Sequence, residues 1–213
     1  MEYASIYQLN SYEHSEEAAK SRRVRDMIKA GRNFNGLMNS LQKKIQDSNH
    51  DFLRKYLNPN TIVVPVPSSN IYSEGNLWVP LEICKSLVGV GLAGEVVPCI
   101  KRIKKIRSSS SCKNADERPN VSEHLDTLKV SNLILGGADV ILVDDILTLG
   151  RTSMACSIKL KEAFPGISVK LLALMRTRNI EGFVRSSYPE EGHITINEST
   201  GKTSISPLWG TSF

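Results

Sequence analysis

The sequence predicts an α/β protein with a mostly parallel, twisted sheet flanked by helices. Three short apolar runs support this prediction, at Thr61–Ser69, Ala138–Val143 and Val169–Met175. Runs that are apolar at nearly every position are typical of strands covered on both faces, as in parallel sheets. Segments with helical spacing separate the runs, and alternation of strands with helices is the chain order of an α/β fold.

The first part of the chain predicts helices that pack on this core. Ser15–Ala30 is charged and has helical spacing, and Gly31 ends it. A second helix is expected over Phe34–Leu57, where apolar residues recur on one face. Asn58-Pro59-Asn60 should end that helix because its residues favour turns.

The middle of the chain continues with alternating elements. Pro65 and Pro67 should end the regular pairing of the strand Thr61–Ser69, because proline cannot donate to a ladder. A helix is expected over Glu74–Val90 and a short strand over Glu95–Ile100.

The end of the chain predicts a small hairpin, because His193–Ile196 and Thr203–Ser206 both alternate between apolar and polar residues. Trp209 and Phe213 are expected to dock on the body. This appendage could form a hood over an acceptor site or bind a protein partner, including a second copy in a homodimer. We therefore expect an N-terminal helical segment, a core and a C-terminal appendage, at 1–58, 59–176 and 177–213.

Composition excludes several classes of protein. No apolar run reaches 18 residues, so we expect no membrane span. The four cysteines and four histidines are scattered, which argues against a zinc site or a disulfide framework. The start MEYASIYQLN lacks the features of a secretion signal, so we expect a cytoplasmic protein. The net charge of +5 suits an anionic small molecule and would also allow weak contact with nucleic acid.

The most informative stretch is Ala138–Ser153, which reads ADVILVDDILTLGRTS. An apolar strand leads to two acids and a polar loop, and apolar residues with helical spacing follow from Ser153. A loop that opens a helix presents free backbone N–H groups and the positive end of the helix dipole, so it favours an anion such as phosphate. The expected phosphate loop is Thr148, Leu149, Gly150, Arg151 and Thr152.

The two acids, Asp144 and Asp145, need a role of their own because carboxylates repel phosphate. They could accept hydrogen bonds from sugar hydroxyls or help hold a Mg²⁺ ion. Adjacent strand residues point to opposite faces, so both acids can line one site only if the chain leaves strand geometry near Asp145.

Two other interpretations of this stretch stay open. One is a buried strand that ends in solvated aspartates before a capped helix. The other is the acidic strand of a P-loop nucleotidase. Its partner motif, G-x-x-x-x-G-K-[ST], would end at Gly201-Lys202-Thr203, but the position of its first glycine is occupied by Ile196.

Val140–Ser153 resembles the signature of type I phosphoribosyltransferases. The resemblance implies their fold and a glycosyl transfer in which ribose 5-phosphate moves from phosphoribosyl pyrophosphate (PRPP) to an acceptor. It implies that Asp144 and Asp145 bind the ribose hydroxyls and that the loop holds the 5′-phosphate. It also implies dependence on Mg²⁺, held through PRPP.

The turn VPVPSS is similar to one in the ComF-like branch of that superfamily, named after a competence protein. There it takes the place of the pyrophosphate-binding loop, which implies that role for Pro67, Ser68 and Ser69. The arginine-rich segment R-x-x-x-R-G-F-N that follows this turn in the branch is absent here.

Lys101–Asn120 begins with five cations and continues with small polar residues. It could be a solvated loop, or a nucleic-acid patch without aromatic residues to stack bases. The superfamily resemblance instead implies a mobile lid that brings Arg102, Lys104 and Lys105 to pyrophosphate. The order of Arg118, Asn120 and Val121 fits the end of the ComF-like lid.

Two functions therefore remain open. The first is a Mg²⁺-dependent phosphoribosyltransferase with an unknown acceptor. The second is a PRPP- or nucleotide-binding regulator with weak or no turnover, in a DNA-uptake, DNA-processing or phage-defence system. The missing arginines and the added hairpin motivate the second function.

Overall fold

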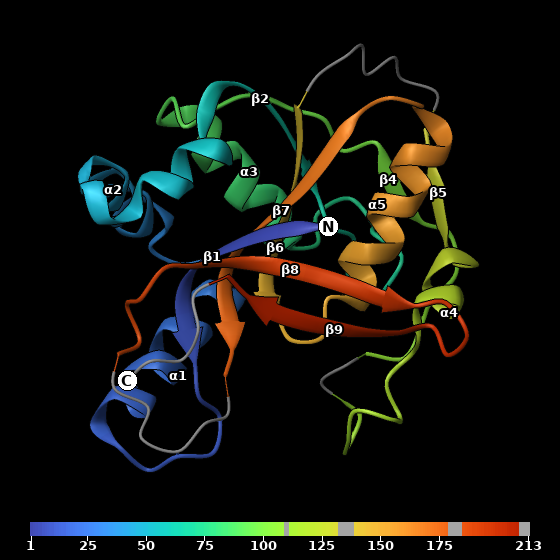
Figure 1. The fold of residues 1–213 in the computed structure, drawn as a ribbon, viewed down its shortest axis with the longest axis horizontal. Coiled ribbons are helices and arrows are strands. Elements are labelled where there is room, and N and C mark those ends of the chain that lie inside the picture. Colours follow the sequence, from blue (N-terminus) through green and yellow to red (C-terminus); the bar gives the residue numbers. More distant parts are fainter. Residues whose placement is uncertain (109–110, 132–138, 179–184, 209–213) are drawn as a thin grey trace.

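The chain folds around one large, mostly parallel sheet (Figure 1). The computed structural model describes residues 1–108, 111–131, 139–178 and 185–208. Within them, the strands of the large sheet lie in the order β3-β2-β6-β7-β1-β8-β9. Their bounds are β1 Glu2–Leu9, β2 Asn58–Pro65, β3 Ala93–Val96, β6 Asp139–Leu147, β7 Ser168–Thr177, β8 Glu190–Asn197 and β9 Lys202–Pro207.

The strands from β3 to β1 in this order run parallel, while β8 and β9 are antiparallel additions at one edge. Strands β2 and β6 are neighbours, with Pro65 opposite Val143. The loops that follow these two strands therefore leave the same edge of the sheet side by side. The predicted α/β class with a mostly parallel sheet is confirmed.

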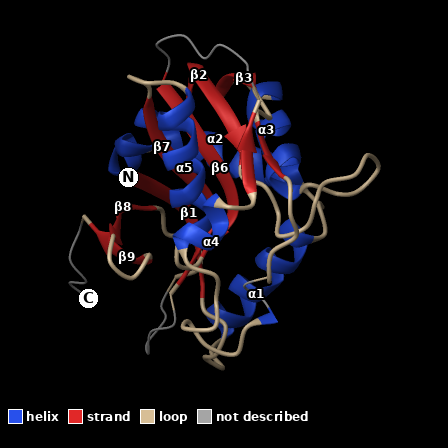
Figure 2. Cartoon of the chain, turned by 90° about the vertical axis from the view of Figure 1, so that its right-hand side faces the viewer, coloured by secondary structure: helices blue, strands red, loops and turns tan. Residues whose placement is uncertain are grey.

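Helices cover both faces of the sheet (Figure 2). One apolar core lies under α1, α2 and α3, and a second lies under α5 and α4. Successive strand residues alternate between the two cores: Ile141 belongs to the first and Leu142 to the second. The helices are α1 Glu16–Lys29, α2 Phe34–Gln46, α3 Val79–Gly89, α4 Val121–Leu125 and α5 Arg151–Ala163, with a 3-10 helix η1 at Ser48–Lys55.

A small antiparallel pair of strands, β4 (Ile100–Arg102) and β5 (Leu128–Val130), lies beside the large sheet. The segment between them contains the basic stretch and α4. The expected lid is therefore rooted in a two-stranded base.

Strand β1 was not predicted from the sequence. It lies inside the large sheet between β7 and β8, and every residue from Tyr3 to Leu9 is buried. The buried polar side chains of Ser5 and Gln8 interrupt the apolar pattern, which hides the strand. Segment 1–58 thus contributes a central strand as well as helices, and the C-terminal hairpin extends the same sheet because β8 pairs with β1.

Two predicted helices are shorter than expected. The helix expected over Phe34–Leu57 stops at Gln46, because Asp47 adopts an extended backbone and its carboxylate accepts from the Asn49 amide. The helix expected over Glu74–Val90 begins only at Val79. Gly75 has φ +89° in the preceding turn, a conformation outside the helical region.

Two predicted strands also have different bounds. The strand expected over Glu95–Ile100 is divided, because Pro98 lies between β3 and β4 and cannot donate to a ladder. Strand β6 continues past Val143 to Leu147. The hairpin is confirmed as β8 and β9, with His193 opposite Ser206. Ala138, Trp209 and Phe213 lie outside the described residues.

No helix in the described ranges is long and apolar enough to cross a membrane. All four cysteines are free thiols, three of them buried.

Candidate functional site

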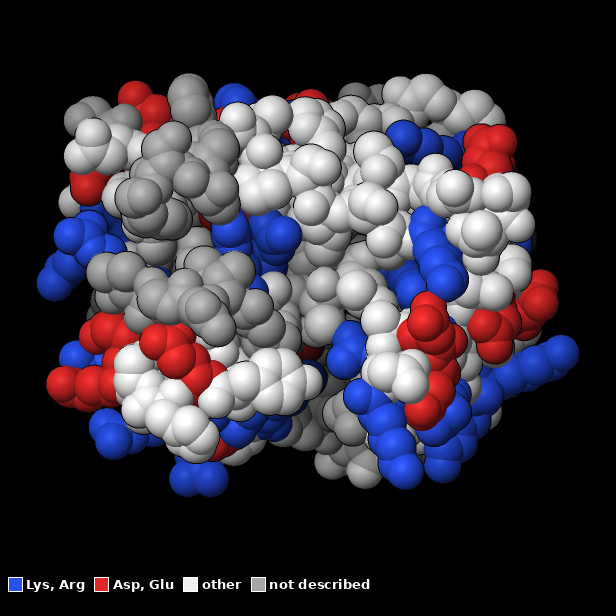
Figure 3. Space-filling model, turned by 60° about the horizontal axis from the view of Figure 1, so that its bottom comes forward, with Lys and Arg blue, Asp and Glu red and all other residues white. Residues whose placement is uncertain are grey.

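A pocket lies where β6 passes into α5, at the carboxyl edge of the parallel strands. Its volume is about 80 Å³, while one water molecule needs roughly 10–15 Å³. It can therefore hold a group of the size of a phosphate. Figure 3 shows this edge of the molecule, with a hollow near its centre and Lys and Arg side chains on both sides. The pocket is lined by Arg118, Asp144 and the continuous stretch from Ile146 to Ser153.

The amino end of α5 is open to a ligand. Its first backbone hydrogen bond runs from the Met154 amide to the Gly150 carbonyl, at 2.8 Å. The amides of Arg151, Thr152 and Ser153 precede that bond and have no acceptor within the described part of the chain. Gly150 at the N-cap has no side chain to cap them. Unsatisfied amides and the positive helix end together favour an anion here.

Gly150 is required by two features of the backbone and packing. Its φ of +70° lies in the left-handed region, which side chains disfavour. A Cβ at this position would lie 2.8 Å from Cδ1 of Ile194 on β8. The loop therefore packs directly against the C-terminal hairpin.

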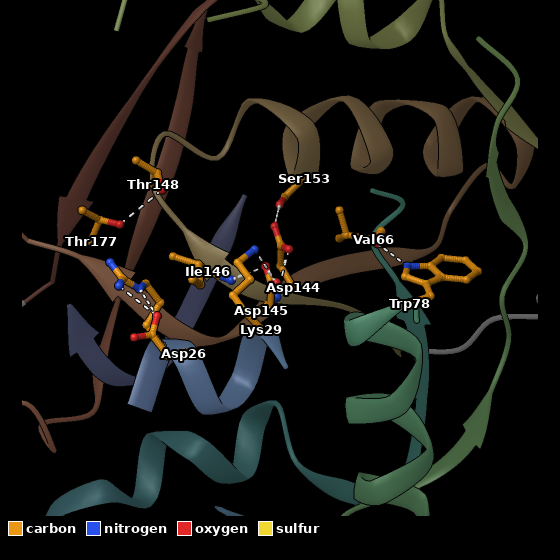
Figure 4. Close-up of polar contacts among 11 residues, drawn as sticks. Asp26, Lys29, Val66, Trp78, Asp144, Asp145, Ile146, Thr148, Ser153 and Thr177 are labelled. Atoms are coloured by element: carbon orange, nitrogen blue, oxygen red, sulfur yellow. Dashed lines mark hydrogen bonds and ion pairs between the residues drawn. The ribbon is translucent and has the colours of Figure 1, made fainter. Parts of the chain in front are cut away.

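Asp144 faces the pocket from the end of β6 (Figure 4). Its carboxylate accepts from the Ser153 hydroxyl at 3.2 Å and from the Asp145 amide at 2.9 Å. Burial and, after it, the negative charge of Asp145 together raise the pKa of the Asp144 carboxyl from 3.8 to about 7. Lys29 and the two hydrogen bonds oppose this rise.

Asp145 is directed away from the pocket, toward α1 on the other face (Figure 4). Its carboxylate lies 2.6 Å from the Lys29 ammonium and accepts from the Ile146 amide at 2.7 Å. Both acids could line one site only if the chain left strand geometry near Asp145. Strand β6 instead continues to Leu147, and its alternation separates the two side chains.

The other loop side chains already have contacts. The hydroxyls of Thr148 and Thr177 lie 3.2 Å apart, and the Leu149 carbonyl accepts from the Thr203 hydroxyl on β9. The Thr152 hydroxyl lies 3.4 Å from Nε2 of His124. Burial and, after it, the positive charges of Arg102 and Arg151 together lower the pKa of His124 to about 4, so this ring is neutral at pH 7.

The guanidinium of Arg151 donates hydrogen bonds to backbone carbonyls of this chain. The side chain is buried, and Nη1 donates to the carbonyls of Ala115, Arg118 and Pro119, at 3.2, 2.6 and 3.4 Å. Arg151 therefore fastens the end of the basic segment to the start of α5.

Arg118 is the pocket residue that the phosphate-loop prediction did not include. It lines the pocket, and its buried Nε has no partner among the described residues. Local patterns could not place it there because it reaches α5 from a distant part of the chain. The available signal was its position just before Asn120 and Val121, where a capped helix begins.

The loop Pro67, Ser68 and Ser69 follows β2 and does not line the pocket. The Ser68 carbonyl accepts from Nε of Arg102 at 2.6 Å, and the Ser69 carbonyl accepts from the Ile106 amide at 3.0 Å. Before this loop, the Val66 carbonyl accepts from the Trp78 indole (Figure 4). The loop is thus held in place by the base of the expected lid.

The three expected lid cations differ in environment. Arg102 is buried and also donates to the Thr127 hydroxyl, so it acts as a structural link rather than a solvent-facing cation. Lys104 and Lys105 are exposed. None of the three lines the pocket.

The described residues contain no cluster of three or more His, Cys, Asp or Glu side chains that could hold a metal ion. Asp144 is the acid that lines the pocket. Mg²⁺ usually binds to proteins through one or two carboxylates together with substrate phosphates. A single carboxylate beside a pocket that favours an anion fits a Mg²⁺ ion that arrives with its ligand.

Comparison with known proteins gives one described similarity. The structure is similar to the hypoxanthine phosphoribosyl transferase of Trypanosoma cruzi, with 14% sequence identity and a TM-score of 0.33. The alignment covers 75% of this chain and 67% of that chain. No model of a protein family matches the sequence, and no curated protein matches it.

Proposed function

We propose that this protein binds PRPP at the carboxyl edge of its sheet, with the 5′-phosphate in the pocket between β6 and α5. The observation that carries the proposal is the uncapped amino end of α5, whose free amides line a pocket large enough for one phosphate. Arg118 adds positive charge, and Asp144 offers an acceptor for a ribose hydroxyl at the rim.

The reaction that fits this geometry is transfer of ribose 5-phosphate to an acceptor. The bond between the ribose and pyrophosphate breaks, and the acceptor forms the new bond to the same carbon. The protein would contribute mainly by orienting the sugar and stabilising charge. Mg²⁺, when bound with PRPP, would neutralise part of the pyrophosphate charge.

The positions of the loop after β2 support a role in binding pyrophosphate. Pro67, Ser68 and Ser69 leave the sheet next to β6, which is where pyrophosphate would extend from a sugar held at Asp144. Lys104 and Lys105 lie just before Ile106, whose amide binds Ser69. The VPVPSS turn and the residues Arg118, Asn120 and Val121 are the basis for proposing a ComF-like member of the superfamily.

A pyrophosphate-release assay tests the enzymatic function. The protein is incubated with PRPP and Mg²⁺ and a panel of bases and amines. We expect release that depends on an acceptor and is lost in Asp144→Asn. The matched control is Asp139→Asn, which changes an exposed acid at the other end of β6. Release that is equal in both variants would contradict this function.

A second candidate is a PRPP- or nucleotide-binding regulator without turnover. Two side chains favour it, because both are bound within the protein. Arg102 is committed to Ser68 and Thr127, and Asp145 is paired with Lys29 instead of facing the ligand. Tight PRPP binding without pyrophosphate release from any acceptor would support this candidate.

A further inference from the structure

We propose that Arg118 is the cationic ligand of the phosphoryl group in this pocket and that Arg151 is the residue that positions it. This inference rests on the proposed phosphate site and adds to it a side chain from outside the loop between β6 and α5.

Arg151 determines where Arg118 lies. One nitrogen of its buried guanidinium binds three carbonyls within the segment from Ala115 to Pro119. The shortest of these bonds, at 2.6 Å, is to the carbonyl of Arg118 itself. This clamp fixes the backbone of Arg118 against the first turn of α5, whose amides are free.

The C-terminal hairpin supports the same segment from outside. Lys202 pairs with Asp116 at 2.8 Å, and the Gly201 carbonyl accepts from the Val121 amide at 3.1 Å. Figure 1 shows the hairpin of β8 and β9 beside α4 and the start of α5. The stretch that carries Arg118 is thus held at both ends as well as by Arg151.

The charge balance of the pocket calls for an anion. Two cations, Arg118 and Arg151, line it against one acid, Asp144, and all three lie next to the positive end of α5. Nε of each of these arginines is buried without a partner in the described chain. A buried donor without an acceptor is costly, and a phosphoryl group has enough oxygens to accept from a guanidinium and from the helix amides together.

Binding of ribose 5-phosphate, measured by calorimetry without Mg²⁺, tests the role of Arg118. We expect Arg118→Gln to weaken binding roughly 10- to 100-fold, the effect of losing hydrogen bonds to a charged group. Arg118→Lys should recover part of the loss because it restores the charge without the forked geometry. Lys113→Gln is the matched control, since it removes an exposed cation five residues before Arg118 that does not line the pocket.

A double-mutant cycle tests the role of Arg151. Arg151→Lys keeps the charge, but its ammonium ends one bond short of the Nη1 position and so does not reach the three carbonyls in the same way. If it acts by positioning Arg118, its effect on ribose 5-phosphate affinity should largely disappear in the Arg118→Gln background. A residue that only stabilises the fold would weaken binding by the same factor in both backgrounds, which would contradict a positioning role.

The outcomes separate this inference from the proposed function. If Arg118→Gln binds ribose 5-phosphate as tightly as the unchanged protein, the inference is wrong, whatever the result with PRPP. If binding depends on Arg118 but the protein neither binds PRPP nor releases pyrophosphate, the inference stands and the proposed function is wrong. If the unchanged protein binds neither ribose 5-phosphate nor inorganic phosphate, the inference is overturned.

Discussion

Asp144 is the residue in which the requirements of the site and of the fold conflict. Burial and the neighbouring charge of Asp145 raise its pKa to about 7, against an ordinary value of 3.8. The folded state therefore binds a proton more tightly than the unfolded state does. This residue lowers the stability of the fold increasingly as the pH rises from about 4 to 7.

Replacing Asp144 with Asn should reveal that conflict. We expect Asp144→Asn to be more stable than the unchanged protein at pH 8, on the order of 2 kcal/mol, and equally stable at pH 4. The same variant should lose PRPP affinity. Urea unfolding at the two pH values measures the first effect, with Asp139→Asn as the exposed control. If the variant is less stable than the unchanged protein at pH 8, the charged Asp144 carboxylate does not destabilise the fold, and the prediction is wrong.

Adding a single Cβ atom at Gly150 tests how closely the proposed phosphate loop packs against the C-terminal hairpin. Gly150→Ala should cost about 1–2 kcal/mol for the left-handed backbone, and more because the new Cβ meets Ile194. Gly166→Ala is the matched control, because Gly166 has φ +89° and nothing lies within 4 Å of its Cβ position. Adding Ile194→Val to Gly150→Ala removes Cδ1, so it should recover part of the extra loss of unfolding free energy relative to Gly166→Ala. Equal unfolding free energies for the two glycine variants would contradict the contact.

At the residue scale, the sequence predicted the phosphate loop but not all of its contacts. The helix start and the free amides follow from local patterns at Gly150 and Thr152, and the structure places them as expected. The direction of Asp145 could not be derived from the sequence because it depends on how far β6 continues. The place of Arg118 was missed because it depends on Arg151, a contact between distant segments.

At the scale of elements, the C-terminal hairpin contacts the loop of the proposed site. Strand β9 binds the Leu149 carbonyl through Thr203, and β8 packs on Gly150 through Ile194. The sequence predicted both strands of this hairpin from their alternation. It could not show what they touch, because β8 is placed by pairing with β1, which itself was hidden by Ser5 and Gln8.

The hairpin contact gives a prediction at this scale. Thr203→Val removes the hydroxyl that binds Leu149, so we expect a loss of about 1 kcal/mol of unfolding free energy and weaker binding of ribose 5-phosphate. Thr195→Val changes an exposed threonine of the same hairpin and should leave affinity unchanged. Thermal unfolding and calorimetry measure the two effects. Equal affinities in both variants would exclude the hairpin from the site.

At the scale of the whole molecule, the structure limits how many cations of the basic segment could contact a nucleic acid. Of the five cations in its first part, Lys101–Arg107, Arg102 is buried and Arg107 pairs with Glu117 at 3.1 Å. Lys101, Lys104 and Lys105 are exposed and have no ion pair within the described residues. If these three lysines contacted three phosphates of duplex DNA, a plot of the logarithm of the binding constant against the logarithm of the salt concentration would have a slope of roughly −3. A steeper slope in a titration would require cations elsewhere on the molecule.

The overall architecture places every proposed ligand group at one edge of the sheet. Parallel strands β2 and β6 deliver the loop of Ser68 and the acid Asp144 to the same edge, and α5 directs its free amides there. This convergence follows from topology, which the alternation of strands and helices indicated. It is the reason for assigning the phosphate, the sugar and the pyrophosphate to adjacent positions.

The most direct test of this account is a crystal structure of the protein soaked with PRPP and Mg²⁺. The account predicts the 5′-phosphoryl group within hydrogen-bond distance of the Arg151, Thr152 and Ser153 amides, with a ribose hydroxyl on Asp144. A ligand bound elsewhere, with these amides still facing an empty pocket, would contradict it.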